Sequence, residues 1–128
     1  PSRAVTLLDA AAMKGNIWAN YELGDAYLQG QAIPRDLTRA KFYLERAAEQ
    51  NNAWALLRLG EMYRDGLGVP ASPADATVLF EQAAVQKNGF ALVALARMIA
   101  PKDAARARAL LAEAAAMGNA EAQAALAE

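Results

Sequence analysis

The sequence predicts an all-α protein whose short helices pair and stack into an α/α superhelical solenoid. A block of residues recurs along the chain, since Leu23-Gly24 returns after 36 residues as Leu59-Gly60. Alanine fills 34 of the 128 positions, and it is both the best helix former and small enough to let helices approach closely. The few prolines and glycines fall at intervals, which favours short helices with regular breaks over one long helix.

The repeat extends over most of the chain. Aligned residues recur in successive copies: Tyr27 and Tyr63, Gly30 and Gly66, Pro34 and Pro70, and the asparagines at 16, 52, 88 and 119. The last spacing falls from 36 to 31 residues because the connector between Met98 and Asp103 is shorter, with a turn at Pro101. A helix pair of this size cannot bury its apolar face alone, so neighbouring pairs must stack.

Each unit is expected to hold two antiparallel helices, a first helix (helix A) and a second helix (helix B). Helix A is predicted over residues 17–29, 53–65 and 90–100, and helix B over residues 37–50, 73–86 and 104–117. Residues 1–128 form a single repeat domain in this interpretation. Its parts are a partial unit at 1–16, units one to three at 17–52, 53–88 and 89–119, and a partial unit at 120–128. Because both ends are half units, we expect the chain to be a segment of a longer protein.

Capping residues mark the expected helix ends. Asp36, Ser72 and Asp103 occupy one aligned position, and each is a favourable N-cap for helix B. Four dipeptides are expected to adopt the left-handed conformation that closes helix B: Gly15-Asn16, Asn51-Asn52, Asn88-Gly89 and Gly118-Asn119.

Two glycines lie in the middle of predicted A helices, Gly24 and Gly60. Glycine costs about 1 kcal/mol relative to alanine inside a helix, so we expect a compensating close contact with an adjacent helix. Leucine at position 60 is expected to overpack this contact.

Composition excludes several classes of function. Thirteen Lys and Arg residues stand against fourteen Asp and Glu residues, and a net charge of −1 provides no field that attracts nucleic acid. The chain has no histidine and no cysteine, so it lacks the commonest general base, the thiolate nucleophile and the usual zinc ligands. We therefore expect no enzyme activity, no catalytic residue, no metal and no cofactor. The longest apolar run, Phe90 to Ala96, is too short for membrane insertion.

The motif LGxxYxxG, followed by a proline-containing loop and AxxxxxxAAEQ, resembles the Sel-one-like repeat, a relative of the tetratricopeptide repeat (TPR). Unit two matches best over residues 59–70 (LGEMYRDGLGVP), and the 36-residue period also favours this family. Unit three departs from the motif, with Ala96 and Ile99 where glycine and tyrosine are expected. The resemblance implies a non-catalytic adaptor, often in the bacterial periplasm and sometimes in exopolysaccharide export, as for the alginate-export lipoprotein. The cysteine-rich branch of the family does not match this chain.

Three aromatic residues, Trp18, Trp54 and Phe90, occupy the same position near the start of successive A helices, and we call them the aromatic row. In TPR-like solenoids helix A lines the concave surface, so the row should face a groove. Aromatic side chains beside charges are typical of binding hot spots. The candidate partner-binding residues are therefore Trp18, Trp54, Phe90, Glu22, Asp25, Arg58 and Glu61. The alternative is that the three rings belong to the core between repeats.

The sequence favours a scaffold or adaptor that binds another protein or peptide on the concave helix-A face. One alternative is a carbohydrate-contacting module of a bacterial exopolysaccharide export complex of the alginate type. Another is a structural spacer that stacks on itself through its open ends. A basic cluster around the shortened turn offers a further surface for an acidic partner or polysaccharide: Arg97, Lys102, Arg106 and Arg108.

Overall fold

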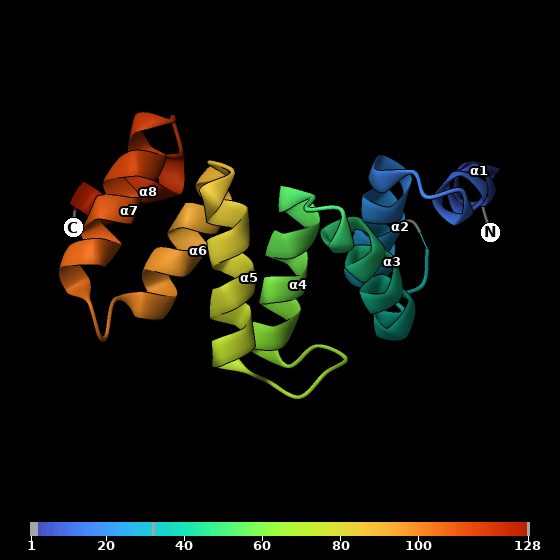
Figure 1. The fold of residues 1–128 in the computed structure, drawn as a ribbon, viewed down its shortest axis with the longest axis horizontal. Helices are drawn as coiled ribbons and strands as arrows, with labels where there is room; N and C mark the ends of the chain where they lie inside the picture. Colours follow the sequence, from blue (N-terminus) through green and yellow to red (C-terminus); the bar gives the residue numbers. More distant parts are fainter. Residues whose placement is uncertain (1–2, 32, 128) are drawn as a thin grey trace.

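The computed structural model describes residues 3–31 and 33–127, and this part of the chain contains eight α-helices and no strand (Figure 1). The helices are α1 (Arg3–Met13), α2 (Ile17–Gln29), α3 (Leu37–Glu49), α4 (Ala53–Asp65), α5 (Pro73–Val85), α6 (Gly89–Ile99), α7 (Ala104–Ala116) and α8 (Ala120–Ala127). The predicted all-α fold is confirmed. Within the described ranges, no helix has the length and apolarity needed to cross a membrane.

The helices form a row of pairs. The most extensive contacts join α2 to α3, α4 to α5 and α6 to α7, while α3 packs on α4 and α5 on α6 to connect the pairs. The helices α1 and α8 pack on α2 and α7 at opposite ends of the row, and the two termini lie far apart (Figure 1). The pair α6–α7 is inclined relative to α4–α5, as expected for a superhelical solenoid (Figure 1).

The buried core runs along the whole row. Three apolar clusters follow one another, and partly buried side chains border two clusters at once: Tyr27 joins the first to the second, and Ala48 and Leu79 join the second to the third. The core is therefore continuous between neighbouring pairs, which is why no single pair needs to be stable alone.

The two mid-helix glycines lie where the helices of a pair approach most closely. A Cβ atom at Gly24 would lie 2.6 Å from Cγ of Leu44, and one at Gly60 would lie 2.5 Å from Cε1 of Phe80. Both Leu44 and Phe80 are completely buried on the B helix of the same pair. The expected close contact is confirmed, and the hydrogen atom of glycine is what makes room for the larger partner.

The turns between units differ from the expectation in one respect. The N-caps Asp36, Ser72 and Asp103 are confirmed, because each side chain accepts a hydrogen bond from a backbone N–H in the first turn of helix B. The aligned asparagines also act as N-caps of helix A, and their side chains accept from the N–H groups of Ala19, Ala55, Ala91 and Ala122. The left-handed residues are the ones before them: Gly15, Asn51, Lys87 and Gly118. The expected left-handed turn at Asn88-Gly89 is therefore wrong.

The shortened connector leaves the junction of its two helices intact. The backbone N–H groups of Asp36 and Ser72 donate to the carbonyl oxygens of Tyr27 and Tyr63, at 3.0 and 2.8 Å. In unit three the N–H of Asp103 donates to the aligned carbonyl of Ile99 at 2.8 Å, although only three residues lie between them instead of eight. Helix α6 begins and ends one residue earlier than predicted, and each B helix ends one residue earlier.

Polar contacts attach α1 to the first pair. The fully buried Asn20 donates from Nδ2 to the carbonyl oxygen of Ala12 at 3.3 Å, and Arg46 donates to the same oxygen at 3.0 Å. The hydroxyl of Tyr43 donates to Oδ1 of Asp9 at 2.5 Å. Burial of Tyr43, which is only 9% exposed, and this hydrogen bond raise its pKa to about 12.

The glycine contact predicts that Gly60→Ala lowers the free energy of unfolding by about 1–3 kcal/mol. The methyl group would collide with the buried ring of Phe80, and this strain exceeds the helix propensity that alanine gains. Urea denaturation measures the difference. The matched control is Gly89→Ala, where the new Cβ atom would meet only ordinary contacts, 3.5 Å or more away, and stability should change little. Equal stability of Gly60→Ala and the wild type would contradict the close packing.

The Tyr43 contact predicts a specific pH dependence above neutrality. Because the folded-state pKa is raised from 10.0 to about 12, the protonated phenol stabilises the fold fully below pH 10, and this contribution is lost as the pH rises towards 12. Measured between pH 9 and 12, the free energy of unfolding of the wild type should fall by roughly 2–3 kcal/mol more than that of Tyr43→Phe. Parallel curves for the two proteins would contradict this role of Tyr43.

Candidate functional site

The aromatic row lies on the surface formed by the A helices α2, α4, α6 and α8, which we call the helix-A face. Trp18 and Phe90 are 58% and 54% exposed, whereas Trp54 is partly buried and packs against the third core cluster. The rings of Trp54 and Phe90 are in contact, with centroids 5.5 Å apart and planes tilted by 47°. Trp18 instead pairs with Tyr21 on its own helix, also at 5.5 Å. The row thus consists of one pair that links α4 to α6 and a separate pair on α2.

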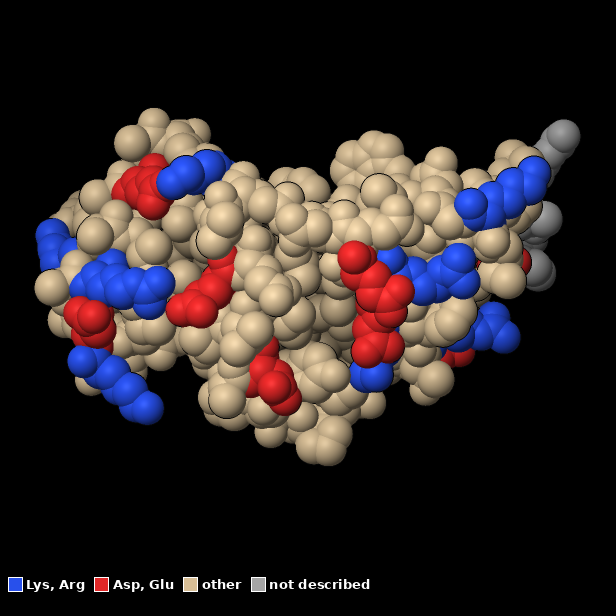
Figure 2. All heavy atoms as spheres, viewed as in Figure 1, with Lys and Arg blue, Asp and Glu red and all other residues tan. Residues whose placement is uncertain are grey.

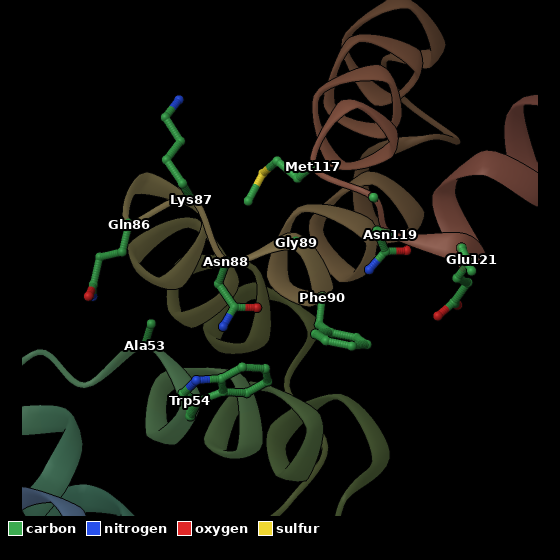
Figure 3. Close-up of a pocket in the computed structure, with 12 residues that line it drawn as sticks. Ala53, Trp54, Gln86, Lys87, Asn88, Gly89, Phe90, Met117, Asn119 and Glu121 are labelled. Atoms are coloured by element: carbon green, nitrogen blue, oxygen red, sulfur yellow. The ribbon is translucent and has the colours of Figure 1, made fainter.

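A large hollow of about 590 Å³ lies beside the Trp54–Phe90 pair (Figure 3). It is bounded by the start of α4, the turn between α5 and α6, and the turn between α7 and α8. In Figure 3, Met117 approaches from the last of these turns, while Lys87 and Gln86 extend away from the rings. The hollow therefore has an aromatic and thioether surface with polar groups at its margin.

Met117 also lines this hollow, and the sequence analysis did not single it out. At the aligned position in the earlier units, Gln50 and Gln86 donate from Nε2 to the carbonyl oxygens of Gly15 and Asn51, at 3.3 and 2.7 Å. Each of these bonds bridges two successive turns. A thioether cannot donate such a bond, so Met117 leaves the gap towards Lys87 open and is 49% exposed. The substitution of methionine for glutamine in the repeat alignment was the available signal.

A second hollow of about 140 Å³ lies on the other side of the same ring pair. Trp54 and Phe90 line it together with charged residues of α4, α6 and α8. Its margin carries Arg58, which donates to Oδ1 of Asp25 at 3.2 Å and to Oε1 of Glu61 at 2.9 Å. Three of the predicted charged residues are therefore brought together across α2 and α4. Glu22 is exposed on α2 and lines neither hollow.

The guanidinium of Arg58 is held in its charged form. Burial disfavours the guanidinium charge, but the hydrogen bond and the charge of Glu61 outweigh it, so the pKa of Arg58 lies above its ordinary value. Its side chain is 24% exposed, so part of this paired side chain still contacts solvent. Such a group can orient a partner without changing its own protonation.

Charged side chains of both signs also lie outside the site (Figure 2). Acidic and basic side chains occur along the whole length of the molecule in the face seen in Figure 2. Among the described residues, no group of three or more Asp or Glu side chains could hold a metal ion. The site thus combines apolar rings with balanced charges, which suits recognition of another surface by shape and local contacts.

A family model for the Sel1 repeat matches the chain at residues 19–52, 55–88 and 95–119. The chain belongs to the Sel1 repeat family. Sel1 repeat proteins are generally protein-interaction scaffolds, and the resemblance noted from the sequence motif is confirmed. Each matched segment falls within one of the three units delimited from the sequence.

Two solved structures resemble this Sel1 repeat chain. One is the Sel1 repeat protein from Oxalobacter formigenes, with 31% identity, a TM-score of 0.84 and 98% of both chains covered. The other is c5321, a protective antigen present in uropathogenic Escherichia coli strains that displays an SLR fold, with 31% identity and a TM-score of 0.86. That alignment covers 93% of this chain but 27% of the antigen, so the present chain spans about a quarter of its length. No curated protein gives a significant match.

The glutamine bridges predict the effect of restoring the third one. In Met117→Gln, the new amide can donate to the carbonyl of Lys87, which should raise the free energy of unfolding by roughly 0.5–1.5 kcal/mol. The reverse change in an intact unit, Gln86→Met, should lower it by a similar amount because its bond to Asn51 is lost. Chemical denaturation of both variants provides the comparison. A stabilising Gln86→Met would show that the bridges do not hold the turns together.

Proposed function

We propose that this chain is a non-catalytic scaffold that holds a partner protein through a peptide segment on the helix-A face. In this proposal an apolar side chain of the partner inserts beside Trp54, Phe90 and Met117. The observation that carries the proposal is the position of the Trp54–Phe90 pair, which borders both hollows of this face at once. A ligand that covered the pair would therefore have apolar surface on one side and fixed charges on the other.

The two sides would contribute differently to binding. Phe90 is 54% exposed in the free protein, and burial of its ring against an apolar anchor would supply most of the affinity. The Asp25–Arg58–Glu61 cluster is already internally paired, so it would fix the orientation and register of the partner more than it would add affinity. The ring of Trp54 contacts that of Phe90 and also packs against the third core cluster, so it connects Phe90 to the core.

A carbohydrate ligand is the alternative that the exposed rings also favour. Sugar rings stack on exposed aromatic side chains, and Trp18 and Phe90 both present such surfaces. Binding of this kind would fit a module of a periplasmic exopolysaccharide export complex. The larger hollow beside Met117 and the paired charges favour a polypeptide, because a side chain can enter the hollow while the backbone meets the charged margin.

The proposal predicts that Phe90→Ala weakens binding of a selected peptide at least tenfold, which corresponds to the loss of about 1.4 kcal/mol. The peptide is selected on the wild-type protein from a phage-displayed library of linear peptides, and its affinity is measured by fluorescence anisotropy. The matched control is Phe42→Ala, which removes a ring of similar exposure, 48%, from the B helix α3. This variant should bind within twofold of the wild type.

Three results would contradict the proposal. The first is the failure of the library to yield a binder, and the second is an equal loss of affinity in both variants. The third is a change of tryptophan fluorescence on titration with an alginate-type oligosaccharide but not with the peptide, which would support the carbohydrate alternative. Sedimentation over a range of concentrations tests the remaining alternative, a spacer that stacks on itself.

A further inference from the structure

A third hollow, of about 550 Å³, lies at the edge of the solenoid opposite to the Met117 hollow. It is formed by the start of α5, the end of α6 and the start of α7, on the edge that carries the α4–α5 connector (Figure 1). Its lining includes Pro73, Thr77, Met98, Ile99, Lys102 and Arg106. None of the candidate residues of the helix-A face contributes to it.

Between units one and two, the corresponding surface is covered by the connector of unit two. The connector of unit two returns over the start of α3, where a Cβ atom at Gly68 would lie 2.8 Å from Cβ of Leu37. Its neighbour Leu67 packs against the second core cluster, together with Leu37. Gly68 has φ +74°, a conformation that favours glycine and allows this close approach. A leucine and a glycine therefore close this edge between units one and two.

In unit three, the segment that would close the edge is absent. Pro73 aligns with Leu37, but the connector that should cross it has three residues (100–102) instead of eight (64–71). The helix junction is unchanged, because the N–H of Asp103 still bonds to the carbonyl of Ile99. The helices have thus not closed over the space, and Met98 and Ile99 remain only partly buried beside the hollow.

Two basic side chains, those of Lys102 and Arg106, and one acidic side chain, that of Asp103, line this hollow. Arg106 pairs with Glu81 at 3.6 Å, and among residues 3–31 and 33–127 no carboxylate forms an ion pair with Lys102. The carboxylate of Asp103 is engaged in capping α7, where it accepts a hydrogen bond from the N–H of Arg106.

We propose that this hollow is a second docking site, which receives an extended segment of a partner protein in place of the missing connector. The segment carries a leucine-like side chain followed by glycine, as Leu67-Gly68 does in unit two, and an acidic residue on its flank that faces Lys102 and Arg106. This site is separate from the helix-A face and does not depend on the function proposed for that face.

The test uses a synthetic peptide, Glu-Asp-Gly-Leu-Gly-Val-Pro-Ala, which repeats the connector of unit two (64–71) with glutamate in place of its first residue, Arg64. The protein is labelled with ¹³C in the methyl groups of its four methionines. The Met98 signal should shift saturably during titration, while the signal of Met13, in α1, should not. A peptide with lysines in place of the two acidic residues should bind at least about tenfold more weakly because its charge opposes Lys102. Phe90→Ala should bind the acidic peptide as the wild type does, which separates this site from the helix-A face.

One variant fills the hollow from within, and a second is its control for connector length. Replacement of residues 100–102 by the eight-residue sequence of 64–71 should abolish peptide binding and raise the melting temperature. The same graft with Gly-Ser pairs throughout restores only the length, and it should retain binding within about threefold. If the first graft does not fold, Ala74→Trp provides the block, since Ala74 is exposed on the first turn of α5 and lines the hollow.

The proposal is overturned if the Met98 signal does not shift, if the lysine peptide binds as well as the acidic one, or if the filled variant binds like the wild type. It is also overturned if sedimentation shows self-association that the graft removes, because the occupant would then be a second copy of this chain.

Discussion

The spacing between the two helices of a pair is the constraint on which the rest of the molecule depends. In units one and two this spacing is set by a glycine facing a completely buried side chain, Leu44 or Phe80. Unit three carries Ala96 in place of the glycine, and Leu111, which aligns with Leu44 and Phe80, is only partly buried. The pair that lacks the glycine is also the pair with the shortened connector. The loss of the glycine contact in unit three therefore accompanies both altered surfaces, the shortened connector at one edge and the Met117 hollow at the other.

Periodicity predicted the six helices of the three full units to within one residue at each end, because apolar spacing and the repeat both report the face that each helix buries. The turns were harder to predict. Adjacent residues such as Asn51 and Asn52 both tolerate a left-handed backbone, and only the structure shows that the second one turns its side chain to cap the next helix. In the turn that leads into unit three, Lys87 takes the left-handed position. Lysine rarely adopts that conformation, so the sequence carried no sign of it.

The candidate site was predicted in part. Repeat alignment placed Trp18, Trp54 and Phe90 at one position of successive A helices, and it treated them as equivalent. Their neighbours are not: Tyr21 aligns with Leu57 and Val93, so Trp18 has an aromatic partner on its own helix, and Trp54 and Phe90 have each other. The role of Met117 could not be predicted from its own properties. It follows from bonds that Gln50 and Gln86 make elsewhere, and these bonds are visible only in three dimensions.

One consequence follows from the backbone bond that closes every connector. Because the same N–H and carbonyl groups meet whether three or eight residues lie between them, the junction between the two helices of a pair is preserved when the connector changes length. Selection can therefore lengthen, shorten or rewrite a connector without disturbing the register of the helices beyond it. In such an architecture the connectors at one edge can evolve new binding surfaces while the packed helices keep their arrangement.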